Sequence, residues 1–199
     1  NYFVHYLFHV DDVLVVANND LLRESLFKIL KRELRIRDEG LVSKFLGMRV
    51  ERLADGSYTM DQQSYIEKMA ELFCVNDDTK TVQQPGIFGQ HLTLDMLPQT
   101  EEEKKVAEKL PMRQLTGGLI YVNKTRPEVA YAISDVARFM SKWGVEHFKR
   151  ALLILKFLYS TRHKKLVFSA TNTPFELACY ADANYGDGRD SGEAADDKW

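Results

Sequence analysis

Two adjacent aspartates between two apolar, strand-forming runs are the feature that most constrains this chain. Residues 2–8 and 13–17 consist almost entirely of Val, Leu, Ala, Tyr and Phe, and β-branched and aromatic residues favour strands. The pattern predicts a β-hairpin with Asp11 and Asp12 at or near its tip. Because both faces of the two runs are apolar, we expect the hairpin to be largely buried.

Adjacent carboxylates on a rigid, buried hairpin repel each other and need a counter-charge. Two divalent cations held about 3.5–4 Å apart meet that need, and such pairs stabilise the attacking and leaving oxygens of a phosphoryl displacement. Magnesium suits the role because it binds carboxylates together with substrate phosphates. Asp is also an ordinary turn residue, so the hairpin alone leaves open a turn without catalytic function.

The composition limits the possible functions. A length of 199 residues allows one large domain or parts of two, and a formal net charge of −2 lacks the basic excess of a free-standing nucleic-acid binder. Cys74 and Cys179 have no metal-ligand spacing, so we expect two buried thiols in a reducing compartment. No apolar run is long enough to span a bilayer, and we expect no membrane partner. The first residue is not Met, and neither end closes an element, which predicts a fragment of a longer protein.

The first part of the chain alternates strand and helix patterns. Residues 18–20 can cap a helix over 21–36, and 44–53 predicts a strand that turns at Asp55-Gly56 and returns over 57–60. A short amphipathic helix follows over 63–73. The polar side of the first helix is basic, and it is either a solvated face or a strip that contacts phosphates. Its basic residues are Lys28, Lys31, Arg32 and Arg35.

The second part of the chain is mainly helical. Residues 76–100 lose periodicity and predict a surface connection between domains. A capping box at 100–103 precedes helices over 111–122, 127–141 and 146–160. The period then returns to two, and strands are predicted over 166–168 and 175–181. Asp182 closes the last of them, where a lone Asp is usually a cap.

The order of short motifs along the chain resembles the reverse transcriptases of copia-type retrotransposons. The aromatic-Val-Asp-Asp motif of that family corresponds to His9-Val10-Asp11-Asp12, and its next element corresponds to Arg37-Asp38-Glu39-Gly40 with Phe45-Leu46-Gly47-Met48. Further matches follow at Gln62 to Ile66, Arg113 to Tyr121, Thr125 to Val129, and His147 through Leu155 to Leu158 and Thr161. The opening of the RNase H domain corresponds to Tyr180-Ala181-Asp182-Ala183-Asn184-Tyr185. Each motif is weak alone, but seven in the right order and spacing are a strong signal.

The resemblance implies a mixed α/β (α+β) fold. It predicts a partial reverse-transcriptase palm over 1–75 that contains the buried hairpin, a linker over 76–100, a helical thumb and connection over 101–163, and the truncated first strands of an RNase H-like domain over 164–199. Asp11 and Asp12 resemble two members of the polymerase carboxylate triad, which binds two Mg²⁺ ions. Asp182 resembles the first metal-binding carboxylate of RNase H. The hairpin over 45–60 resembles the element that grips the primer.

The same resemblance implies an RNA-directed DNA polymerase whose partners are an RNA template, a DNA primer, dNTPs and the rest of the Pol polyprotein. Its expected location is intracellular, in a cytoplasmic particle and the nucleus. Phosphate contacts would come from the basic helix and from Arg162, Lys164 and Lys165. The first triad aspartate and the fingers are expected upstream of Asn1, so this chain alone should neither polymerise DNA nor cleave RNA.

Some residues depart from the family pattern and keep alternatives open. His9 replaces the usual Tyr beside the primer terminus, and Asn184 replaces the second Asp of the RNase H opening. The remaining RNase H carboxylates are absent. One alternative is an inactive relic of a retroelement. Another is a non-catalytic module that binds nucleic acid through the basic residues.

Overall fold

The computed structural model describes residues 2–80, 82–87, 89–170 and 179. These residues form two compact units: the first contains residues 2–61 and Leu166–Ala170, and the second contains the described residues of Gln62–Lys165. Among the described residues, no helix combines the length and the apolar character needed to cross a membrane. Each unit is described by itself.

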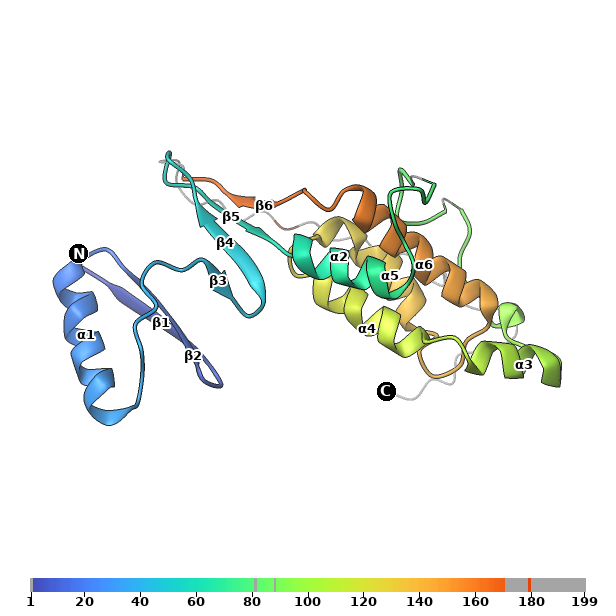
Figure 1. Ribbon diagram of the computed structural model, residues 1–199, viewed down its shortest axis with the longest axis horizontal. Coiled ribbons are helices and arrows are strands. Elements are labelled where there is room, and N and C mark those ends of the chain that lie inside the picture. The colour runs from blue at the N-terminus through green and yellow to red at the C-terminus, as the bar shows by residue number, and fades with distance from the viewer. Residues whose placement is uncertain (1, 81, 88, 171–178, 180–199) are drawn as a thin grey trace. The chain divides into compact units, whose positions relative to one another are not determined.

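The first unit begins with the predicted hairpin and helix. Strand β1 (Val4–His9) pairs antiparallel with β2 (Asp12–Ala17), and α1 (Asp20–Glu33) packs against β2 (Figure 1). The predicted cap is confirmed, because the Asn19 side chain accepts a hydrogen bond from the Leu22 N–H. The helix ends earlier than predicted: Leu34 has an extended backbone, so Arg35 lies beyond it.

The prediction that the hairpin is largely buried is wrong for this chain. Each residue of β1 after Val4 is exposed, and α1 has no fully buried residue. Tyr6 retains 57% of its accessible surface and Leu7 retains 54%. The reason is that the apolar residues occupy both faces of the hairpin, whereas the one helix that packs on β2 in the described part of the chain covers only part of this surface.

A second sheet completes the first unit, with strand order β3-β4-β5-β6 and antiparallel pairing throughout. Its strands are β3 (Lys44–Phe45), β4 (Met48–Arg52), β5 (Tyr58–Asp61) and β6 (Leu166–Phe168). The predicted turn at Asp55-Gly56 is confirmed, and so is the strand over 166–168, which pairs with β5 (Figure 1). The strand predicted over 175–181 lies outside the described residues, apart from Cys179.

The strand predicted over 44–53 is in fact two strands joined by a tight turn. Leu46 and Gly47 form the turn, with φ angles of 48° and 78°. Two consecutive positive φ angles are the geometry of the hairpin turn that matches strand twist. Gly adopts it without cost, whereas Leu rarely does. Because the turn lies within an apolar run, the hydrophobic periodicity of the sequence does not indicate it.

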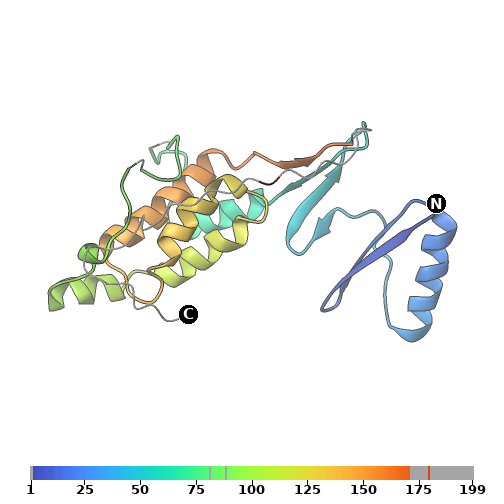
Figure 2. The ribbon, with the colours of Figure 1, turned by 180° about the vertical axis from the view of Figure 1, so that it is seen from behind.

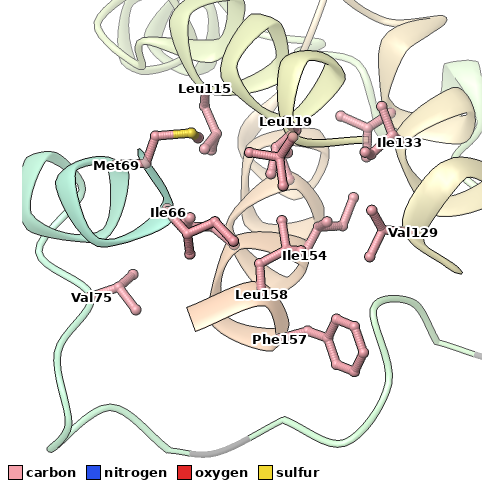
Figure 3. Packing of buried hydrophobic residues seen from close by; sticks show 14 of the residues in the cluster. Ile66, Met69, Val75, Leu115, Leu119, Val129, Ile133, Ile154, Phe157 and Leu158 are labelled. Atoms are coloured by element: carbon pink, nitrogen blue, oxygen red, sulfur yellow. The ribbon is translucent and has the colours of Figure 1, made fainter. Parts of the chain in front are cut away.

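The second unit is a helical bundle built around α6 (Val145–Ser160). That helix packs against α2 (Gln63–Leu72), α4 (Met112–Val122) and α5 (Ala130–Ala137) (Figure 2). Its sequence is apolar nearly all round, as a helix with neighbours on several sides requires. In the interior, side chains from all four helices meet (Figure 3). They include Ile66, Leu115, Leu119, Ile133, Ile154 and Leu158.

The remaining helices agree with the predictions in part. The capping box before α3 (Glu101–Glu108) is confirmed, with reciprocal hydrogen bonds between Thr100 and Glu103. The helix predicted over 127–141 is shorter, because a 3₁₀ turn at Pro127–Val129 precedes α5 and the α-helix ends at Ala137.

The segment predicted as a surface connection is attached to the bundle. Leu92 is buried in the core, and both its backbone N–H and its backbone carbonyl form hydrogen bonds with side chains of the bundle. Its N–H donates to Asp135 (3.4 Å) and its carbonyl accepts from Arg138 (3.3 Å). Arg150 donates to the carbonyl of Gln90 (3.1 Å). This segment also contains a 3₁₀ turn at Leu94–Met96.

The prediction of two buried thiols is wrong, since Cys74 and Cys179 are both exposed. Cys74 follows α2 with a positive φ of 56°. The N–H of Cys74 donates to Glu71 and that of Val75 donates to Ala70, which is the hydrogen-bond pattern of a Schellman cap. Because the chain reverses direction at Cys74, the next residue, Val75, lies in the core while the Cys74 side chain stays exposed.

Substitution by alanine should have opposite effects on stability at two neighbouring glycines of α4. A Cβ at Gly118 would lie 2.7 Å from the Met69 thioether, whereas a Cβ at Gly117 would meet nothing within 4 Å. We expect Gly118→Ala to lower the free energy of unfolding by about 1–2 kcal/mol through overpacking. Gly117→Ala, the matched control, should raise it by up to about 1 kcal/mol through helix propensity. Urea titration measures both, and equal effects would contradict this account of the contact between α2 and α4.

His147 is a buried histidine whose titration we expect to make the stability of the bundle depend on pH. Its side chain is fully buried, and its Nδ1 accepts a hydrogen bond from the Gly144 N–H (3.0 Å). Burial lowers the pKa of His147, while the Thr93 backbone and the carboxylates of Asp135 and Glu146 oppose that shift. Because the folded pKa is the lower one, the unfolded chain binds the proton more readily.

We therefore expect the contribution of His147 to the free energy of unfolding to be constant above the ordinary histidine pKa. As the pH falls from about 6.5 towards the lower folded pKa of His147, that free energy should decline, by at most about 1.4 kcal/mol per pH unit. Urea unfolding between neutral and mildly acidic pH measures this slope. His147→Gln removes the titrating group, so an unchanged slope in that variant would assign the effect to other residues.

Candidate active-site hairpin

The hairpin holds the two predicted aspartates in a fixed register. Six residue pairs run from Val4 opposite Ala17 to His9 opposite Asp12. Asn18 closes the open end, because it exchanges two hydrogen bonds with the backbone of Phe3: the Phe3 N–H donates to Asn18 Oδ1 (2.8 Å) and the Asn18 N–H donates to the Phe3 carbonyl (3.3 Å). Asp11 therefore lies in the two-residue turn and Asp12 begins the returning strand, as the sequence predicts.

The turn is strained immediately before the carboxylates. Val10 has a φ of 54° and retains 93% of its accessible surface. A β-branched side chain is disfavoured in this left-handed region. Asp11 and Asp12 are both exposed, so their carboxylates are accessible to a cation from solvent.

The donor chemistry of the turn fits part of a magnesium site. Two carboxylates supply the hard oxygen ligands that Mg²⁺ prefers. Within the described residues, however, no three side chains of His, Cys, Asp or Glu come together in a metal-binding arrangement. The structure therefore places the two predicted aspartates at consecutive positions of the turn and the returning strand, and no third ligand joins them within the described part of the chain.

The predicted basic residues of α1 are exposed, in the same unit as the hairpin. Lys28 points to solvent, Lys31 lies over the Phe27 ring (4.9 Å) and Arg32 pairs with Glu33 (2.7 Å). Arg35 lies past the end of the helix. The solvated face and the phosphate-binding strip both remain compatible with this arrangement.

The second predicted basic group lies in the helical unit, and Arg162 has internal partners there. Its guanidinium donates to the Tyr159 carbonyl (2.9 Å) and lies over the Tyr159 ring (4.3 Å). It also forms ion pairs with Glu67 (3.6 Å) and Asp77 (3.4 Å). Arg162 thus stabilises the end of α6, while Lys164 and Lys165 are exposed. Asp182 and Asn184 lie outside the described residues.

The sequence interpretation missed several buried polar residues. Arg126 retains 2% of its accessible surface, and Asp61 and Gln62 are each 3% exposed. Asp61 pairs with Arg49 across β4 and β5 (2.8 Å), and Gln62 accepts a hydrogen bond from Thr125 (2.9 Å). The cross-strand register was the one signal that could have paired Arg49 with Asp61. The contact between Gln62 and Thr125 joins distant segments and has no local signal.

Comparison with known proteins identifies relatives over nearly the whole chain. A retrovirus-related Pol polyprotein from transposon TNT 1-94 of Nicotiana tabacum is 32% identical over 92% of the chain. A putative transposon Ty5-1 protein of Saccharomyces cerevisiae is 28% identical over 89% of it, and a Pol polyprotein from transposon RE1 of Arabidopsis thaliana is 25% identical over 94%. No family model and no solved structure matches the chain.

The chain covers only a part of these relatives. It spans 14% of the tobacco polyprotein, 12% of the Arabidopsis polyprotein and 56% of the yeast protein. A Pol polyprotein from transposon RE2 of Arabidopsis thaliana is a further relative. The alignments with these four proteins each cover about nine-tenths of the chain. The resemblance drawn from the motifs is confirmed at the level of the family: the chain is homologous to the Pol polyproteins of copia-type retrotransposons.

Proposed function

We propose that this chain is the reverse-transcriptase segment of such a polyprotein, from the second part of the palm through the thumb and connection. The observation that carries the proposal is the hairpin with Asp11 and Asp12 side by side at its exposed turn. The order of seven sequence motifs and the homology to Pol polyproteins support it.

In this proposal Asp11 and Asp12 hold magnesium together with a third carboxylate from another part of the polyprotein. Bound Mg²⁺ would activate the primer 3′-hydroxyl and neutralise charge on the incoming triphosphate. The hairpin would hold the backbone of the two aspartates in place. The pairing of β1 with β2 and the hydrogen bonds of Asn18 fix the register of this hairpin. The RNA template, DNA primer and dNTPs are the proposed substrates, and an RNase H-like start after residue 164 stays a prediction.

Primer extension tests the proposal directly. A chimera that joins the preceding Pol segment of the tobacco relative to this chain should extend a DNA primer on an RNA template with magnesium. The chain alone should not, because no third carboxylate joins the turn within the described residues. Extension by the isolated chain above the level of its Asp11→Asn variant would contradict the second expectation, and an inactive but folded chimera would contradict the first.

A further inference from the structure

A segment of the connection between α2 and α3 lies against the start of α6, and few contacts hold it there. We call this segment the strap (residues 90–98). Its 3₁₀ turn contacts α6, and both views show this light green turn beside the start of that helix (Figures 1 and 2). Of the strap residues, all of which the structure describes, only Leu92 is buried. Asp135 and Arg138 of α5 bind the two backbone polar groups of Leu92.

The second half of the strap lies directly on Gly144, the residue before α6. A Cβ added to Gly144 would overlap the Met96 carbonyl oxygen and would touch the Pro98 Cδ (3.4 Å). Because the two segments are this close, a displacement of the Gly144 backbone has to displace the strap. The helix itself is fixed by its packing against α2, α4 and α5, so the strap is the part that can move.

His147 holds Gly144 in place from within the bundle. Its Nδ1 accepts a hydrogen bond from the Gly144 N–H (3.0 Å), its ring centroid lies 4.1 Å from that of Phe139, and its side chain is fully buried. A neutral imidazole that accepts at Nδ1 carries its proton on Nε2. The Thr93 backbone lies near the ring, but Nε2 forms no hydrogen bond of normal geometry within the described part of the chain.

Protonation of His147 sets two donors against each other. In the imidazolium ring Nδ1 also carries a hydrogen, so it can no longer accept from the Gly144 N–H and faces that donor instead. An opposed pair of buried donors is unfavourable, since neither can be hydrated in the closed bundle. The charged ring is therefore compatible with the fold only after Gly144 and the ring have separated.

The charges around the ring do not compensate for its burial. The surrounding elements carry titratable and charged groups on α5, on α6 and on the strap: Asp135, Arg138, Glu146, Lys149, Arg150, His91 and Asp95. The carboxylates of Asp135 and Glu146 favour the charged ring, but burial is the larger influence and lowers the pKa of His147. Both carboxylates are already ion-paired, each at 2.6 Å.

We propose that the strap is held by a pH-sensitive contact: protonation of His147 breaks its bond to Gly144 and releases residues 90–98, while the four core helices stay packed. In the released state the ring is hydrated and takes up its proton near the ordinary histidine pKa of about 6.5. The closed state binds the proton less readily, so release becomes more favourable as the pH falls below that value, and the strap stays closed above it. This contact does not depend on the proposed function.

Native-state hydrogen exchange of the full 199-residue chain tests the release. Mass spectrometry follows peptides over 90–98 and over 112–122 at about pH 7.5 and about pH 5.5, with unfolded peptides as the reference for intrinsic exchange. The opening constant of the strap should rise severalfold between the two conditions, and by at most about tenfold. Low urea should leave this opening unchanged because it is local, whereas exchange of the α4 peptide should increase because it requires global unfolding.

His147→Gln is the matched variant for this test. Glutamine at the third position of a helix can accept the same Gly144 N–H, and it does not titrate, so the strap should stay closed at both pH values. His91→Gln is the control, because His91 is an exposed histidine of the strap itself, and it should leave the wild-type response unchanged. Circular dichroism shows whether each variant is folded.

Three results would overturn the inference, and the first two need only the wild-type chain. Equal opening constants and equal urea dependence for the strap and α4 peptides would show that protonation acts through global unfolding. A strap opening that is the same at both pH values would remove the pH-sensitive contact. A pH response that persists in folded His147→Gln would assign the release to another group, such as Asp135. Primer extension by the chimera is unaffected by any of these results, so the proposed function is tested separately.

Discussion

Asp11→Asn in the primer-extending chimera is expected to lower the extension rate on the order of 1,000-fold. Asp11 lies in the hairpin turn and Asp12 directly follows it, and in the proposed function their carboxylates bind magnesium. A metal that stabilises transition-state charge contributes several kcal/mol, and a thousandfold rate loss corresponds to about 4 kcal/mol. Asn keeps the size and turn preference of Asp but removes the charge.

The matched control for this prediction is Asp20→Asn. Asp20 is an exposed carboxylate in the first turn of α1 and pairs with Arg23 (3.0 Å). It belongs to the same unit but lies away from the turn, so the extension rate should stay within about twofold. Asp12→Asn in the same assay shows whether losing the second carboxylate lowers the extension rate by a comparable factor. Full activity in both Asp11→Asn and Asp12→Asn would remove the hairpin from the active site.

Arg126→Met is expected to lower the free energy of unfolding of the helical unit by about 1–3 kcal/mol, because the Thr161 carbonyl and hydroxyl lose a charged donor. The guanidinium donates to the Thr161 carbonyl (3.1 Å) and hydroxyl (2.6 Å), and it pairs with Glu128 (2.7 Å). It also lies over the Phe157 ring (5.8 Å). These contacts tie the start of the 3₁₀ turn before α5 to the end of α6. Methionine preserves most of the packing volume and removes all the donors.

Urea unfolding of the full chain measures this loss. Arg126→Lys keeps the charge but cannot reproduce the planar fork, so we expect a loss between that of the Met variant and zero. Lys149→Met is the control, because Lys149 pairs with Glu146 at the surface of the same bundle and such pairs contribute less than about 1 kcal/mol. A Met variant as stable as the Lys149 control would show that the buried arginine contributes little.

The candidate site was accessible to sequence reasoning because its signals are local. The strand pattern around residues 11–12 and the short motifs depend on residues close to one another in the chain. The pairing register confirms the predicted hairpin, with Asp11 in the turn and Asp12 at the start of the returning strand. The basic residues were found in the same way, but the sequence could not separate Arg162, with its four internal contacts, from the exposed Lys164.

Burial was the property that the sequence predicted least well. The hairpin was expected in a core and is exposed, whereas the segment over 76–100 was expected on the surface and contributes the buried Leu92. Cys74 was expected inside, but the cap of α2 exposes it. In each instance the outcome depends on which distant element covers a residue or on how a helix ends.

The sequence by itself determined the relation to copia-type Pol polyproteins, the apolar helix near residues 146–160, the capping box at Thr100 and the hairpin with Asp11 and Asp12 at its turn. These follow from side-chain periodicity and from hydrogen bonds between near neighbours, which the chain encodes locally. Only the tertiary structure decided that β6 pairs with β5, that Arg126 is buried against Thr161, and that Gly144 lies against Met96 and Pro98. Those contacts join residues far apart in the chain, and no local pattern specifies which distant segment a strand or side chain will meet.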